Sequence, residues 1–221
     1  MASPYLAYCP LPKSMWSDEE LVLRWKDGDA AAGDLLARRH YEPVRRFFDL
    51  RLPAEAEDLT QQAFLACSAG LERKRESSSF RAYLFGTARN LLMRKLRDLH
   101  RFERMAQFRA AAGPDTELSP SGVVALRQEH KVLLRALDEV PTDAQIALQL
   151  FYWEGMDSYE IADVLGISKS GVTSRLHRAR TALREQIEQI RAKPEVRASI
   201  LADLEGWTRS LVPGARPIAT R

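Results

Sequence analysis

The 221-residue chain has little cysteine and no long apolar run, and each absence excludes a class of protein. Its two cysteines, Cys9 and Cys67, lie far apart in the sequence, so neither a disulfide framework nor a zinc site is predicted. No stretch has the length and hydrophobicity of a membrane span, and prolines interrupt the apolar residues near the N-terminus. We therefore expect a cytoplasmic protein with no export signal and no membrane insertion.

The sequence also lacks the residue groupings of an active site. It has no glycine-rich phosphate-binding loop, no nucleophile beside a base and no metal-ligand cluster. The four histidines, His40, His100, His130 and His177, are scattered, and we expect them to lie on the surface. We therefore predict a protein that is not an enzyme and that uses no cofactor, no metal and no small-molecule substrate.

Positive charge is concentrated rather than abundant. The formal net charge is only +3, but residues 72–104 carry ten lysines or arginines against four acids. A protein that binds nucleic acid needs a local basic face more than a large total charge. This segment is the first of two basic regions.

The second basic region, residues 158–184, has the pattern of a helix-turn-helix. Ala162 allows two helices to approach closely, Gly166 supplies the positive φ of a tight turn, and Val172 and Leu176 face inward. The opposite face of the second helix has hydroxyls and an amine near its start and arginines further along, which suits base edges and phosphates of a major groove. The predicted DNA-binding residues are Ser168, Lys169, Ser170, Thr173, Ser174, Arg175, Arg178 and Arg180. An ordinary amphipathic helix pair with a solvated basic face is the alternative.

The remaining pattern predicts an all-α fold of two small helical domains. After an N-terminal arm (residues 1–16), a capping box from Ser17 to Glu20 starts a helix, Asp29 caps the next, and Pro53 introduces a third with acidic first turns. A basic, serine-rich loop then precedes a long helix that begins at Phe80.

That long helix interleaves aromatic residues and arginines. Phe80, Leu84, Ala88, Leu91 and Leu92 are predicted to face inward. Tyr83, Arg89, Asn90, Arg94 and Arg97 spread over the other faces, where flat aromatic and guanidinium groups suit unstacked single-stranded bases. Core aromatics beside a solvated charged face explain the same pattern equally well.

The first domain is expected to end at residue 104, followed by a flexible linker over residues 105–122. In the second domain, residues 123–190, a further capping box from Thr142 to Gln145 is predicted to start a helix that ends at Gly155. The C-terminal extension, residues 191–221, contains one amphipathic segment. Its apolar stripe is Ile200, Leu201, Leu204, Trp207 and Leu211.

Four stretches, in this order, resemble a bacterial RNA polymerase sigma factor of the extracytoplasmic-function (ECF) type in the sigma-70 family. They are AEDLTQQAFL (56–65), FRAYLFGTARN (80–90), LDEVP (137–141) and FYWEGMDSYEIADVLGISKSGVTSRLHRARTALR (151–184). The resemblance covers about residues 17–190. It implies that residues 17–104 correspond to sigma region 2 and residues 123–190 to sigma region 4.

The resemblance implies three surfaces. Asp58, Gln61 and Gln62 match positions that bind core RNA polymerase. The residues that match the part that melts the −10 promoter element are Arg73, Lys74, Arg75, Ser79, Tyr83, Arg89, Asn90, Arg94 and Arg97. The helix over residues 168–180 matches the reader of the −35 element, although Gly171 and Thr173 stand where the family usually has Thr and Lys.

The expected partners are core RNA polymerase, promoter DNA and an anti-sigma factor. A stand-alone dimeric helix-turn-helix regulator that binds a palindromic operator is the main alternative. An adaptor that binds only another protein is a third reading, but it leaves both basic regions without a role. The C-terminal extension is expected either to modulate activity by packing on one of the chain's own domains or simply to extend the core of the second domain.

Overall fold

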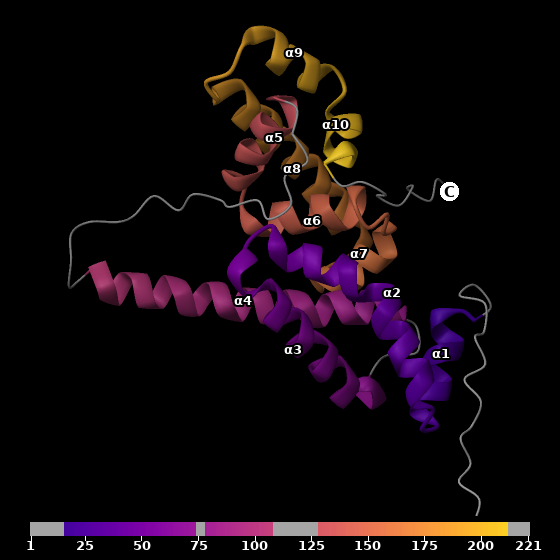
Figure 1. Cartoon of the computed structure of the whole chain (residues 1–221). Helices are drawn as coiled ribbons and strands as arrows, with labels where there is room; N and C mark the ends of the chain where they lie inside the picture. Colours follow the sequence, from indigo (N-terminus) through magenta and orange to yellow (C-terminus); the bar gives the residue numbers. More distant parts are fainter. Residues whose placement is uncertain (1–15, 74–77, 108–127, 212–221) are drawn as a thin grey trace, which may run out of the picture.

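The computed structural model describes residues 16–73, 78–107 and 128–211. In these ranges all regular structure is helical, which confirms the predicted all-α class (Figure 1). The first domain consists of α1 (Asp18–Lys26), α2 (Ala30–Asp49), the 3₁₀ turn η1 (Pro53–Glu55), α3 (Ala56–Ala69), the 3₁₀ turn η2 (Leu71–Arg73) and α4 (Phe80–Gln107). Helix α4 continues three residues into the segment expected as linker.

The second domain contains six helices in the described part of the chain. They are α5 (Gln128–Asp138), α6 (Thr142–Tyr152), α7 (Ser158–Leu165), α8 (Lys169–Gln189), α9 (Pro194–Ala202) and α10 (Leu204–Ser210). The C-terminal extension therefore forms two helices, and the prediction of one was wrong. Asp203 has a non-helical backbone, with φ of −139° and ψ of 62°, and its carboxylate accepts a hydrogen bond from the Gly206 amide, so it separates the two helices and caps the second.

Local sequence signals set several helix ends as predicted. Ser17 and Glu20 form the reciprocal capping box of α1, and the Asp29 carboxylate accepts from two amides in the first turn of α2. The predicted box of Thr142 and Gln145 does not form. The Gln145 side-chain amide instead donates to the Val140 carbonyl at 2.8 Å, so it ties α6 to the end of α5.

His40 is buried, and the expectation of a surface histidine was wrong for this residue. Its Nε2 lies 2.6 Å from a carboxylate oxygen of Asp18, and Arg39 reaches the other oxygen at 3.0 Å. Burial alone would raise the pKa of Asp18, but the hydrogen bonds and positive charge from His40 and Arg39 outweigh it and lower the pKa to about 2. Asp18 therefore joins the start of α1 to α2.

This arrangement predicts an acid-sensitive contribution to stability. Because the pKa of Asp18 is lower in the folded chain than in the unfolded one, its contribution of about 2 kcal/mol is present above about pH 4 and is lost as the pH falls toward 2. Asp18→Asn should lower the free energy of unfolding by about this amount at pH 7 and flatten the acid limb in denaturant titrations. Glu19→Gln, which changes an exposed carboxylate in the same turn, is the control. Equal acid sensitivity of Asp18→Asn and wild type would contradict the assignment.

The C-terminal helices are part of the second domain. Val196, Ile200 and Leu204 are buried, and α9 and α10 pack on α5, α6 and α8 (Figure 1). The Trp153 indole N–H donates to the Thr208 carbonyl at 2.7 Å, and Trp207 lies edge-on to His130. The extension thus packs on the second domain, an arrangement that both expectations for it share.

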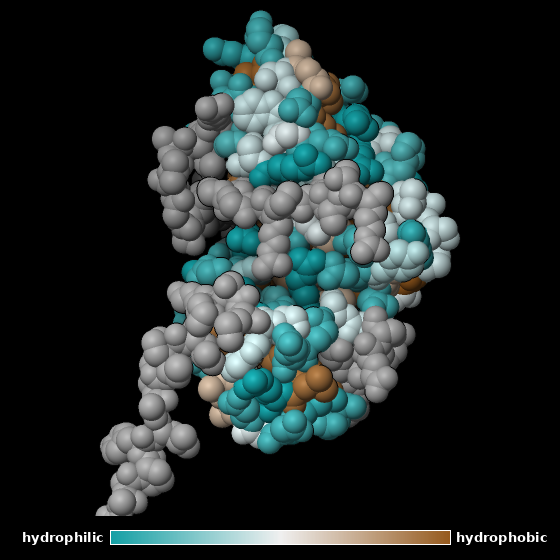
Figure 2. Space-filling model, turned by 90° about the vertical axis from the view of Figure 1, so that its right-hand side faces the viewer, coloured by the Kyte–Doolittle hydropathy of each residue, from teal (hydrophilic) through white to brown (hydrophobic). Residues whose placement is uncertain are grey.

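The described helices leave a mostly polar exterior. The face shown in Figure 2 is largely hydrophilic, with small apolar patches between polar side chains. Within the described residues, no helix combines the length and the hydrophobicity needed to cross a membrane.

Candidate nucleic-acid interface

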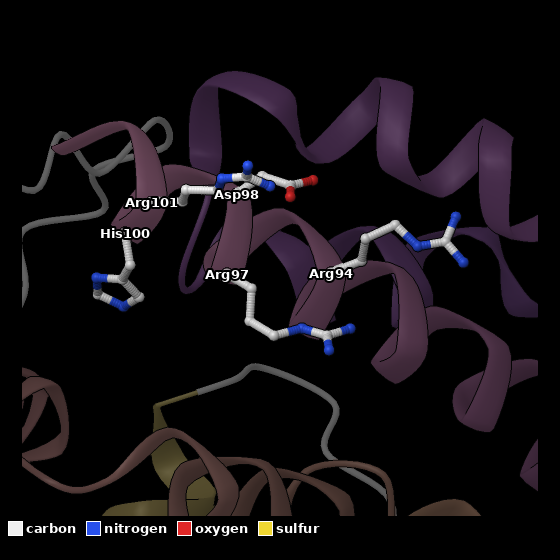
Figure 3. A pocket seen from close by; sticks show the side chains of 5 residues that line it. All are labelled: Arg94, Arg97, Asp98, His100 and Arg101. Atoms are coloured by element: carbon white, nitrogen blue, oxygen red, sulfur yellow. The ribbon is translucent and has the colours of Figure 1, made fainter. Parts of the chain in front are cut away.

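One basic surface follows the exposed side of α4. Asn90, Arg94, Arg97 and Arg101 are exposed and recur at helical spacing, so they lie along one side of the helix. Two open hollows run along this side. The hollow of about 500 Å³ is lined by Arg94, Arg97, Asp98, His100 and Arg101 (Figure 3), and the hollow of about 470 Å³ is lined by Arg89, Asn90, Met93, Arg94 and Arg97.

The C-terminal half of α4 extends beyond the rest of the first domain (Figure 1). In Figure 3, Arg97 and His100 point from α4 toward the second domain. The Arg97 Nε donates to the Met93 carbonyl of the preceding turn, which holds the side chain along the helix. A row of guanidinium groups on a projecting helix can neutralise the phosphates of a strand that lies along it.

The other predicted −10 residues that the structure describes lie on α4 or just before it. They are held by contacts with other groups of the protein. The Ser79 hydroxyl accepts from the Ala82 amide and donates to Glu160 of α7. Tyr83 is half-buried, and its hydroxyl packs against Gly70. Arg89 donates to Asp143 at 3.0 Å. Lys74, Arg75 and the side chain of Arg73 lie outside the described residues.

The second surface is a helix-turn-helix with a cap at each local boundary. Asp157 and Glu160 form a capping box that starts α7. Gly166 ends α7 with φ of 66°, the left-handed conformation that glycine adopts without a steric penalty. The Ser168 hydroxyl then accepts from the Gly171 amide and starts α8. These caps fix where the exposed side of α8 begins.

Six of the eight residues predicted to contact a −35 element lie at the N-cap or on the exposed side of α8. These six are Ser168, Lys169, Ser170, Thr173, Ser174 and Arg178. The Lys169 ammonium lies 4.0 Å from the ring centroid of Tyr159, which is itself 65% exposed. This cation–π contact holds the amine at the N-terminal end of the helix, where a groove-binding helix approaches DNA.

The remaining two arginines turn toward other parts of the chain. Arg175 lies 3.7 Å from an oxygen of Asp143. Arg180 donates to the Tyr152 hydroxyl at 2.7 Å and lies 3.8 Å from Glu205 of α10. Burial raises the pKa of Tyr152, and Glu205 raises it further, although Arg180 opposes both.

A third surface lies on α3. Asp58, Gln61, Gln62 and Leu65 are exposed at positions i, i+3, i+4 and i+7, so they share one face. The Gln62 amide donates to the Asp58 carboxylate at 2.6 Å. Leu65 is 70% exposed, so it adds an apolar side chain at the C-terminal end of this polar face.

Two family models match this chain in the order of its two domains. "Sigma-70 region 2" matches residues 36–102, and "Sigma-70, region 4" matches residues 130–183. Together they span more than half of the chain, and they contain the α3 and α4 surfaces and the helix-turn-helix respectively. The chain belongs to the sigma-70 family.

Curated relatives agree with this assignment. The chain is 32% identical over 140 residues to a probable RNA polymerase sigma factor, RfaY, of Xanthomonas campestris, covering 62% of this chain and 35% of that protein. It is 26% identical over 185 residues to the ECF RNA polymerase sigma-E factor of Escherichia coli K12, covering 79% and 96%. The chain thus spans about a third of the first relative and nearly all of the second. The resemblance to ECF-type sigma factors is confirmed.

Solved structures share the fold. CnrH, in a complex with the cytosolic domain of CnrY, is 25% identical, with a TM-score of 0.56 over 79% of this chain and 99% of that one. The sigma factor RpoE of Bartonella quintana, in a complex with the anti-sigma factor NepR, is 22% identical, with a TM-score of 0.54 over 70% and 96%.

Three exposed residues on these sigma-region surfaces were missed as site residues by the sequence reasoning. Leu65 continues the α3 face one helical turn beyond Gln61. Arg101 continues the row on α4, and His177 is exposed four residues after Thr173 on α8. Helical spacing alone could have found each of them. Within the described residues, no group of three or more His, Cys, Asp or Glu side chains is placed to hold a metal ion.

Proposed function

We propose that this sigma factor binds core RNA polymerase and directs promoter-specific initiation of transcription. In this proposal α8 reads the −35 element as duplex, the exposed side of α4 binds and helps to open the −10 element, and the α3 face binds the polymerase. The chain itself catalyses no reaction: it contributes binding energy to the open promoter.

The observation that supports the proposal is that each sigma-region domain has an exposed polar helix face, and that the two faces differ in chemistry. Hydroxyls and one amine begin α8, which suits base edges in a major groove. Arginines line the hollows along α4, and their guanidinium groups suit the phosphates of an unpaired strand. A single-site duplex binder would need only the first of these.

Run-off transcription tests the proposal directly. Core polymerase is incubated on a promoter library with and without this chain, and specific transcripts are expected only with the chain.

Arg178→Ala removes an exposed cation from the recognition helix and should reduce −35-dependent transcription several-fold, whereas Arg184→Ala, on another side of α8, should have little effect. The rival palindrome-binding regulator requires tight operator binding without polymerase, and that result together with no transcripts would overturn the proposal.

We also propose an anti-sigma factor as a partner. The support is that the sigma factor RpoE of Bartonella quintana, which shares this fold, forms a complex with the anti-sigma factor NepR. A protein of this type should suppress the run-off transcripts when it is added before polymerase. It should have no effect when it is added to a preformed holoenzyme that is already at the promoter.

Leu65 yields a prediction for polymerase binding. Because the side chain is largely exposed in the free chain, Leu65→Asp should change stability by no more than about 0.5 kcal/mol. If the α3 face binds the polymerase, the introduced carboxylate is removed from water without a partner, so affinity for core polymerase should fall roughly tenfold or more. Fluorescence anisotropy of a labelled chain titrated with core measures this. The control is Leu23→Asp, which alters another exposed leucine on α1; equal losses for the two variants would count against the α3 face.

A further inference from the structure

Arg180 of the recognition helix α8 lies at the edge of the exposed side of that helix. It follows Lys169 by eleven residues and Thr173 by seven, and both spacings are close to whole numbers of helical turns. The three side chains therefore lie along one side of α8, with Arg180 about 10 Å beyond Thr173 toward the C-terminus. In the proposed function the start of this row reads base edges. An arginine at its far end is placed to bind a phosphate of the same duplex.

Two residues from other helices hold this arginine. Its Nε donates to the Tyr152 hydroxyl of α6 at 2.7 Å and lies 3.8 Å from one carboxylate oxygen of Glu205 on α10. Its guanidinium carbon lies 5.2 Å from the ring centroid of Phe151 and 5.5 Å from that of Tyr152. Because Tyr152 is buried, the hydroxyl that accepts from Nε is itself fixed by the core. Arg180 is thus restrained through its Nε and the face of its guanidinium.

The restraint leaves the outer part of the guanidinium available. In the part of the chain that the structure describes, the polar contacts of Arg180 all involve Nε, and none of its nitrogens is buried without a partner. Its two Nη groups therefore keep access to solvent, and these are groups with which an arginine can bind two phosphate oxygens at once. Arg175 differs, because its Nη1 already lies 3.7 Å from Asp143.

Glu205 is held in place by its own helix. Its second carboxylate oxygen lies 3.5 Å from Nη2 of Arg209, one turn later on α10. The guanidinium carbon of Arg209 lies 5.7 Å from the ring centroid of Tyr152, so the two arginines lie on either side of this carboxylate. Helix α10 lies beyond residues 130–183, which the sigma-70 region 4 model matches. The contact with Glu205 therefore comes from the C-terminal extension of this chain.

We propose that Tyr152 and Glu205 are positioning residues for Arg180, and that α10 thereby strengthens the contact of α8 with a phosphate of the −35 element. A flexible arginine loses conformational freedom when it binds, and a guanidinium that is already restrained loses less. The C-terminal extension then supports DNA binding as well as stability. This inference rests on the proposed function, since it refines how the recognition helix binds its duplex.

Two variants remove the restraint without changing α8. Tyr152→Phe removes the hydroxyl and leaves the charge unchanged, and Glu205→Gln removes the carboxylate. Each is also made in an Arg180→Ala background. Glu195→Gln, at an exposed acid on α9, is the control for loss of negative charge. Ile200→Val, which trims a buried side chain of α9, is the control for a modest loss of stability.

Binding of the holoenzyme to a labelled promoter fragment from the run-off experiment is measured over a range of salt concentrations. Tyr152→Phe and Glu205→Gln should each bind roughly threefold more weakly, and neither control should weaken binding. Arg180→Ala should weaken binding and reduce the slope of log K against log salt by about one. In the Arg180→Ala background the effects of the other two substitutions should disappear.

The direction of the Glu205→Gln effect is decisive. Removal of an acid beside a DNA-binding face ordinarily tightens binding, so weaker binding could not arise from the change in net charge. Tighter or unchanged binding by Glu205→Gln would overturn the positioning role. The role would also be overturned if Arg180→Ala bound as tightly as wild type, or if the losses persisted without Arg180.

The restraint can also be followed without polymerase or DNA. In ¹⁵N NMR spectra of the full free chain, the Arg180 Nε–H signal is identified by its absence in Arg180→Lys. This proton should exchange slowly with water in wild type and rapidly in Tyr152→Phe, because a hydrogen bond to a buried acceptor protects it. Rapid exchange in wild type together with normal run-off transcription would remove the positioning role and leave the sigma function intact. Slow exchange without any transcripts would instead remove the proposed function, and the DNA role of Arg180 with it.

Discussion

A chain that ends after Lys193 is expected to lose about 4 kcal/mol of free energy of unfolding in its second domain. Val196, Ile200 and Leu204 are buried, and removing each of these apolar side chains from the packed domain costs roughly 1.5–3 kcal/mol. The Trp153 indole N–H would also lose the Thr208 carbonyl. Urea denaturation followed by circular dichroism measures the loss.

The control for this truncation is a chain that ends after Leu211, which keeps both helices. It should unfold at the same urea concentration as the full chain. Because the truncation lowers stability, transcription by the shorter chain is measured at a temperature where it remains folded. Removal of α10 also takes Glu205 away from Arg180. Unchanged stability and unchanged promoter-dependent transcription after truncation at Lys193 would mean that the C-terminal helices are neither structural nor regulatory.

The parts of the fold that could be predicted from the sequence are those that neighbouring residues determine. The capping box at Ser17, the left-handed turn at Gly166 and the exposed start of α8 each depend on side chains within four positions of one another. Residue spacing over the same short range also determines which face of a helix is polar. For this reason the exposed arginines of α4 and the exposed face of α3 could be recognised as surfaces before their surroundings were known.

Contacts between residues that are distant in the sequence could not be predicted from it. His40 was expected at the surface, but Asp18, 22 positions earlier, gives it a buried partner. Arg89 and Arg175 lie on faces that sequence periodicity assigns to solvent, yet both contact Asp143. Periodicity identifies the polar side of a helix, but it cannot say whether another domain covers that side.

Phe85 shows the same limit in the core, because the inward stripe predicted for α4 did not include it. The side chain is fully buried, and its ring meets Phe47 of α2 edge-on, with centroids 5.6 Å apart. The N-terminal half of α4 is covered by its own domain and by α7, so more of its circumference is buried than a one-sided amphipathic helix requires.

Phe85→Ala should therefore destabilise the first domain by roughly 3–5 kcal/mol, since it removes an aromatic side chain from a packed site. Leu23→Ala, at a leucine that is 63% exposed, should change stability by less than about 0.5 kcal/mol. Denaturant titration of the full chain compares the two, and similar losses would show that the core does not depend on the α2–α4 contact. Because Phe85 is buried and is not one of the proposed DNA-contact residues, transcription lost in Phe85→Ala should return on cooling to a temperature at which the variant is folded. A proposed contact residue such as Arg178 should show no such recovery, and this difference separates residues that stabilise the domain from residues that the proposal assigns to DNA.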